Sequence, residues 1–125
     1  MTYLRGLLTA SVVFALAACA TGLGTPTTGL TGTVTRGPIT PVCMIDVPCY
    51  APFSANFTVK RGSSTVASFH SDDQGQFTVM LFPGTYSIIP ASDAPVMMAS
   101  SQGKTVTVNP TGMTTVQLEF DTGIR

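Results

Sequence analysis

The sequence is poor in charged residues and in histidine. Only 10% of its 125 residues are charged, with six Lys and Arg against six Asp and Glu. Such a chain has no excess of cations to neutralise a phosphate backbone, so no nucleic acid partner is expected. His70 is the only histidine, and no third Cys or His lies near Cys43 and Cys49. A zinc or copper site needs three or four such ligands, so we expect no metal and no cofactor.

Long apolar runs and helical periodicity are also absent. The apolar stretch Leu7–Ala18 has about a dozen residues, whereas a membrane-spanning helix needs roughly 20. It follows Arg5 and ends in small residues, an order that is typical of an export signal. No segment after residue 18 has the 3.6-residue period of an amphipathic helix. We therefore expect an exported chain without a spanning helix.

Leu16-Ala17-Ala18-Cys19 ends the apolar stretch. This tetrad resembles the lipobox of bacterial lipoproteins, in which the cysteine becomes the acylated first residue of the mature protein. The resemblance implies that residues 1–18 are a signal peptide and that Cys19 carries fatty acyl groups such as palmitate. It also implies a lipid-anchored envelope protein, in the outer membrane where the host has one, because Ala20 is not Asp. Cleavage after Ala17 or Ala20 is the alternative and gives a soluble secreted protein.

The three cysteines support export independently. If Cys19 is acylated, Cys43 and Cys49 remain as a pair in a compartment where disulfides persist. A redox-active pair usually has two intervening residues, whereas five separate these two. We expect a structural disulfide that stabilises the domain by about 2 kcal/mol.

Residues 19–30 have the small, Gly- and Thr-rich composition of a flexible tether, with a reach on the order of 18 Å. From residue 31 onward the apolar residues alternate with period two, which is typical of strands with one buried face. This pattern covers residues 31–36, 56–60, 76–81, 85–88, 105–109 and 115–120. A seventh strand near 64–69 has no clear inward face, because Val66 and Phe69 have opposite parity. The sequence predicts an all-β domain over 31–125, an antiparallel immunoglobulin-like sandwich of about seven strands.

Turn motifs separate these strands. Asp72-Asp73-Gln74-Gly75-Gln76-Phe77 and Pro83-Gly84-Thr85-Tyr86 match a D-x-x-G-x-F turn and a P-G-x-Y strand opening, and Gly32-Thr33-Val34 supplies an upstream G-x-V. Together they resemble the carboxypeptidase regulatory-like domains, which have the prealbumin (transthyretin-like) β-sandwich fold. The resemblance implies a fold and no particular activity, because such modules accompany many unrelated activities.

Phe77 and Tyr86 are the predicted core residues of these motifs. Tyr86 is either a tyrosine corner, with its hydroxyl bonded to upstream backbone, or a core tyrosine with its hydroxyl at the rim. Because the Pro83-Gly84 turn is tight, we expect the Phe77 and Tyr86 rings to lie close across a hairpin.

His70, Ser71, Asp72 and Asp73 invite a catalytic interpretation that their spacing does not favour. Consecutive residues of an extended chain point to alternating faces and cannot converge. We expect His70 to be a solvated residue at a hairpin rim, and the two Asp residues to serve the turn instead of binding calcium. The adjacent Met97 and Met98 cannot both join one copper site for the same reason.

These observations favour a non-enzymatic, monomeric lipoprotein that presents its domain to an envelope protein. The candidate contact regions are residues 38–52 and 91–101, which are apolar without strand-like alternation. The alternatives are a small-molecule or metal carrier, or a secreted soluble domain. The related hydroxyisourate hydrolases use several histidines and end in Y-R-G-S, whereas this chain has one histidine and ends in Thr-Gly-Ile-Arg. An enzyme is therefore not expected.

Overall fold

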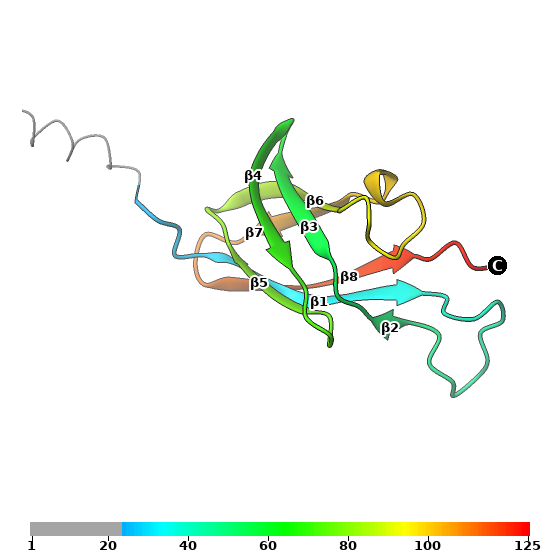
Figure 1. Ribbon diagram of the computed structural model, residues 1–125. Coiled ribbons are helices and arrows are strands. Elements are labelled where there is room, and N and C mark those ends of the chain that lie inside the picture. The colour runs from blue at the N-terminus through cyan, green and yellow to red at the C-terminus, as the bar shows by residue number, and fades with distance from the viewer. Residues whose placement is uncertain (1–23) are drawn as a thin grey trace, which may run out of the picture.

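The computed structural model describes residues 24–125, which form two packed β-sheets (Figure 1). The export signal and Cys19 lie outside the described residues. The elements are β1 (Gly29–Gly37), β2 (Ala51–Pro52), β3 (Asn56–Arg61), β4 (Ser64–His70), β5 (Gln76–Met80), β6 (Gly84–Pro90), a 3₁₀ turn η1 (Ala99–Ser101), β7 (Lys104–Val108) and β8 (Met113–Asp121).

The first sheet is built around β1. On one side β1 pairs antiparallel with β5 and β2, and on the other it pairs with β8. The β8 pairing is parallel, from Gly29 opposite Met113 to Gly37 opposite Asp121. The second sheet is wholly antiparallel, in the order β4-β3-β6-β7. The predicted sandwich is confirmed, with one parallel pair because the chain passes through the second sheet and returns along β1 in the same direction.

The structure differs from the prediction most in one additional strand and in the earlier start of β1. The eighth strand is the two-residue β2, which is too short to show an alternating pattern. β1 begins at Gly29 instead of Thr31, and Leu30, which we placed in the tether, is fully buried. One apolar residue at the end of a Gly- and Thr-rich segment gives no periodic signal, so the pattern underestimates the strand.

A β-bulge determines which side chains of β4 point into the core. Val59 lies opposite Ala67 while the next residue, Lys60, lies opposite Thr65, so Val66 is an extra residue in the ladder. Phe69 is consequently buried and Val66 is 48% exposed. An inserted residue reverses the inward and outward alternation, which explains the conflicting parity of the sequence pattern.

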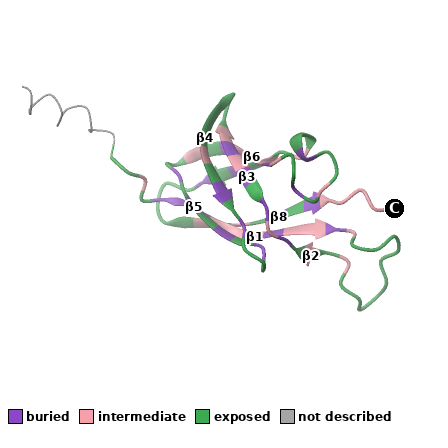
Figure 2. Ribbon diagram, in the orientation of Figure 1, coloured by how far each residue is buried: buried purple, intermediate pink, exposed green. Residues whose placement is uncertain are grey.

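An aromatic cluster joins the two sheets, and the buried residues line the space between them (Figure 2). The Phe69 ring of the second sheet stacks on the Phe77 ring of the first, with centroids 4.4 Å apart. Phe57 stacks on Phe69 at 5.0 Å and approaches Phe120 at 5.6 Å. These contacts fix the sheets face to face through rings that interlock.

Phe77 and Tyr86 are both buried, as predicted, but the expected hairpin between them is wrong. β5 pairs with β1 in the first sheet, and β6 pairs with β3 and β7 in the second. The connection around Pro83 is therefore a crossover between sheets. A tight turn forms a hairpin only when the two strands that it connects pair with each other in one sheet. The turn residues alone do not determine which strands pair.

The two ends of the sandwich carry different segments (Figure 1). Residues 24–28 enter at one end, beside the connections 81–83 and 109–112, and we call this end the tethered pole. The opposite end holds the loop 38–50, the segment 91–103 and the C-terminal residues 122–125. We call it the loop pole.

Candidate functional site

The loop 38–50 of the loop pole is closed by a disulfide. Cys43 and Cys49 are bonded, with Cα atoms 5.5 Å apart, as the cysteine count predicts. The Ile39 amide donates to the Cys49 carbonyl at 2.8 Å, and the Tyr50 ring covers Gly37 closely enough to leave no room for a side chain there. The loop is thus held both at its base and across its middle.

This loop exposes an unusual amount of apolar surface. Ile45 is 90% exposed, Val42 71%, Met44 67% and Val47 54%. Apolar patches on the surface of a monomer are characteristic of contact sites, because the exposure of apolar side chains to water is unfavourable. The sequence-based choice of residues 38–52 therefore corresponds to a protruding, stapled apolar loop.

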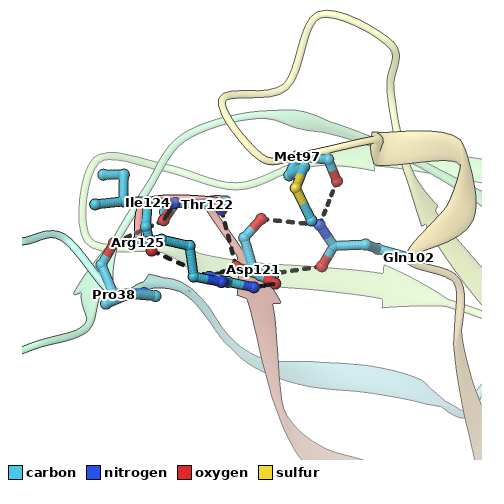
Figure 3. A network of polar contacts seen from close by, with 8 residues as sticks. Pro38, Met97, Gln102, Asp121, Thr122, Ile124 and Arg125 are labelled. Carbon is cyan, nitrogen blue, oxygen red and sulfur yellow. Dashed lines mark hydrogen bonds and ion pairs between the residues drawn. The ribbon is translucent and has the colours of Figure 1, made fainter. Parts of the chain in front are cut away.

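The second candidate segment, 91–101, is fastened to the sheet by Gln102 (Figure 3). Its side-chain amide donates to the Asp121 carbonyl at 2.8 Å and accepts from the Asp121 amide at 2.7 Å. The same amide nitrogen also donates to the Met97 carbonyl. Gln102 thereby pairs with the backbone of Asp121, the last residue of β8, and holds Met97 and the exposed Met98 at the loop pole.

The C-terminal residues connect the two candidate segments (Figure 3). The Thr122 hydroxyl donates to the Pro38 carbonyl at 2.6 Å, and its amide donates to the Gly37 carbonyl at 3.0 Å. Arg125 pairs with Asp121 at 3.0 Å. The hydrogen bond from the Arg125 guanidinium is the main reason that the pKa of Asp121 is lowered. Both groups are solvent-exposed, so the pair is a surface feature of modest strength.

A charged hollow of about 440 Å³ lies at the loop pole, between the ends of the loop 38–50 and the residues Gln102 and Lys104. Its lining includes Tyr50, Lys104, Glu119, Asp121 and Arg125. The loop pole thus combines exposed apolar side chains with a polar recess of both charge signs, an arrangement that resembles the core and rim of a protein interface.

The residues of the fold motif have structural roles. Asp72 Oδ1 accepts from the amides of Gln74 and Gln76 at 2.9 Å each, and Gly75 has φ of 73°. Phe77 then enters the core. The turn role expected for Asp72 and Gly75 is therefore what the structure contains.

The structure distinguishes the two alternatives that the sequence allowed for Tyr86. Its hydroxyl donates to the Phe82 carbonyl at 2.7 Å while its ring is buried. This upstream backbone contact favours the tyrosine-corner alternative. It also holds the crossover that contains Pro83 and precedes Gly84.

His70 has partners that sequence reasoning missed. Its Nε2 lies 2.9 Å from Ser54 Oγ and its Nδ1 lies 2.8 Å from Asn56 Oδ1. These partners are 16 and 14 residues away, so only the pairing of β3 with β4 brings them together. The Ser54 hydroxyl also donates to the Ser71 carbonyl.

The order Ser54, His70, Asn56 resembles a nucleophile, base and orienting residue. An acyl-transfer site also needs N–H donors aimed at the developing oxyanion. The amide that follows Ser54 belongs to Ala55 and is already bonded to Ser71 Oγ at 2.9 Å. These contacts tie the start of β3 to the end of β4, and His70 is exposed, as expected.

No helix in residues 24–125 is long and apolar enough to cross a membrane. Within the same range, no three residues of the His, Cys, Asp and Glu types gather closely enough to hold a metal ion.

Comparisons with known proteins identify similar folds. No family model matches the sequence, and no curated protein matches it. A DUF3823 family protein from Bacteroides ovatus ATCC 8483 has a similar structure, with a TM-score of 0.52, 21% identity, and coverage of 76% of this chain and 44% of the other. A DUF3823 family protein from Parabacteroides merdae ATCC 43184 matches with a TM-score of 0.50, 19% identity, and coverage of 78% and 47%. This chain therefore spans less than half of each neighbour, and the likeness concerns the fold.

Proposed function

We propose that this chain is a bacterial envelope lipoprotein, anchored through acylated Cys19, whose non-enzymatic β-sandwich presents the loop pole to a protein partner. The observation that carries the proposal is the separation of the two poles. The chain enters at the tethered pole, whereas the stapled loop with Ile45 projects from the opposite end (Figure 1). An anchor on the N-terminal side would leave that loop directed away from the membrane.

The domain type proposed is the carboxypeptidase regulatory-like sandwich. Its support is local geometry: the Asp72 turn, the positive φ of Gly75, the buried Phe77 and the Tyr86 corner all occur where the family motifs require them. The two-sheet fold is compatible with that family. Loops positioned by a rigid scaffold are where binding usually resides, which agrees with the exposed loop pole.

The partner that fits the loop pole is a protein with an apolar recess. Val42, Met44, Ile45 and Val47 would be buried in such a recess, at about 25 cal/mol for each Å² of apolar surface removed from water. The disulfide between Cys43 and Cys49 keeps the loop pre-organised, so less conformational entropy is lost on binding.

The anchor is tested by membrane fractionation of Cys19→Ser. The native chain should sediment with membranes, and the variant should be soluble or remain uncleaved. The control is the double variant Cys43→Ser/Cys49→Ser, which loses the disulfide and should still sediment. A Cys19→Ser protein that fractionates like the native chain would contradict the anchor.

The contact surface is tested by photo-crosslinking in intact cells. A photoreactive amino acid at position 45 should give one discrete crosslinked product. The same amino acid at Ser68, an exposed position on β4, serves as the matched control and should give none. Crosslinks at position 68 without any at position 45 would place the partner elsewhere.

A further inference from the structure

The tethered pole has an apolar surface of its own. Phe82 is 47% exposed, Val66 48%, Met80 45% and Met113 40%. Three of these, Phe82, Val66 and Met80, line a hollow of about 260 Å³ together with Pro26, Arg61 and Tyr86. The hollow lies where the edge strands β4 and β5 approach the entry of the chain.

The charge at this pole is only positive. Lys60 and Arg61 end β3, and the Arg61 guanidinium lies 5.7 Å from the centre of the Tyr86 ring. In the described range the one ion pair joins Asp121 to Arg125 at the opposite pole, so neither cation has a carboxylate partner. The acidic residues lie in the loop 38–50, the turn after β4, the segment 91–103 and the far half of β8: Asp46, Asp72, Asp73, Asp93, Glu119 and Asp121.

Two hydrogen bonds hold Thr28, at the entry of the chain, beside the residue that precedes Phe82. Thr28 is buried, its hydroxyl donates to the Leu81 carbonyl at 2.6 Å, and the Leu81 amide donates to the Thr28 carbonyl at 2.9 Å. Because the fold already includes Thr28, only residues 20–27 are left between the proposed anchor and the domain. Eight residues span at most roughly 27 Å, the length of a fully extended chain.

We propose that the tethered pole docks on an anionic lipid surface, with Phe82 and Met80 at the boundary between headgroups and acyl chains and Lys60 and Arg61 at lipid phosphates. This inference rests on the proposed anchor, which by itself leaves the orientation of the domain free. A short tether keeps the pole at high effective concentration near the bilayer, so a weak contact is sufficient to orient the domain. Basic residues close to an anionic surface add to that attraction.

The absence of tryptophan from the chain allows a direct test. Phe82→Trp places a single fluorophore at the exposed position of the tethered pole, and Ile45→Trp places one at the loop pole as the matched control. Both are prepared as the full lipidated chain in vesicles of phosphatidylcholine and phosphatidylglycerol, with and without brominated acyl chains. Brominated chains quench only a fluorophore that reaches the acyl region.

We expect brominated lipid to quench the tryptophan at position 82 about twofold or more and to leave the one at position 45 unquenched. Equal quenching at both positions would overturn the proposal. A blue-shifted emission at position 82 that brominated lipid does not quench would also overturn it, because the residue would then be covered by protein, such as a second copy of the chain.

The electrostatic part is tested by adding Lys60→Gln and Arg61→Gln to Phe82→Trp. The quenching should fall toward that measured in vesicles of phosphatidylcholine alone. Quenching that is the same with and without phosphatidylglycerol would contradict a role for lipid phosphates. Failure of the anchor is distinguishable, because neither tryptophan variant would then sediment with vesicles.

Discussion

The two poles of the sandwich expose similar kinds of apolar residues on different supports. At the tethered pole they lie at strand ends, on a bulge and in the short connection around Phe82, close to backbone that is paired in the sheets. At the loop pole they lie on a long loop held by one disulfide. The tethered pole carries cations alone, whereas the loop pole carries both signs. The two poles therefore differ in the backbone that supports their apolar residues and in the charges beside them, and these differences are the basis for proposing different partners.

Substitutions in the core, between the two poles, should have the largest effect on the free energy of unfolding. Phe77→Ala removes a ring that stacks on Phe69 between the sheets and should lower the free energy of unfolding by about 3–5 kcal/mol. A domain of this size has about 5–15 kcal/mol in total, so thermal unfolding should occur at a much lower temperature. Phe82→Ala is the matched control, because that ring is half exposed. Equal destabilisation by the two variants would contradict the assignment of the core.

Removal of the disulfide should destabilise the loop pole and leave the tethered pole unchanged. Cys43→Ser/Cys49→Ser removes the cross-link and should cost about 2 kcal/mol in chemical denaturation. Hydrogen exchange should accelerate at the Ile39 amide, which bonds to Cys49, and remain unchanged at the Leu81 amide of the tethered pole. Faster exchange at both amides would show that the poles are coupled.

Gln102 should have a smaller effect that is confined to the loop pole. Gln102→Ala leaves the backbone of Asp121 and Met97 without its side-chain partner and should cost about 1–2 kcal/mol. Gln117→Ala is the control, since Gln117 is exposed on β8. Gln102→Ala should unfold at a lower temperature than Gln117→Ala. Equal melting temperatures would contradict the role of Gln102 in holding Asp121 and Met97 together.

The Asp121–Arg125 pair should give the smallest effect. The pKa of Asp121 is lowered below its ordinary value of 3.8, mainly by the Arg125 hydrogen bond. The pair therefore stabilises the fold above that ordinary value, and its contribution disappears as the pH falls through the lowered pKa. Arg125→Gln should raise the pKa of Asp121 in an NMR titration while stability changes little, because exposed charges are screened. An unchanged pKa would contradict the pairing.

The sequence predicted the strands well because each has one apolar face. Phe57, Val59, Ile88 and Val108 all lie in the core where the period-two pattern placed them. The disulfide followed from the count of cysteines. These features depend on neighbours in the chain or on composition.

Four features could not be predicted because they depend on residues far apart in the chain. The parallel pairing of β1 with β8 and the crossover at Pro83 are decided by which sheet each strand joins. The contacts of His70 with Ser54 and Asn56 require the β3–β4 ladder. Val66 likewise joins the apolar surface of the tethered pole only because the bulge in β4 turns it outward.

The proposed acylation of Cys19 would set the orientation of both poles, so both proposals depend on it most. The intact mass of the chain extracted from membranes with detergent measures this directly. We expect a polypeptide that begins at Cys19, retains the Cys43–Cys49 disulfide and is heavier than residues 19–125 by the mass of its acyl groups. A mass that corresponds to an unmodified chain, cleaved at another position or not cleaved, would contradict it.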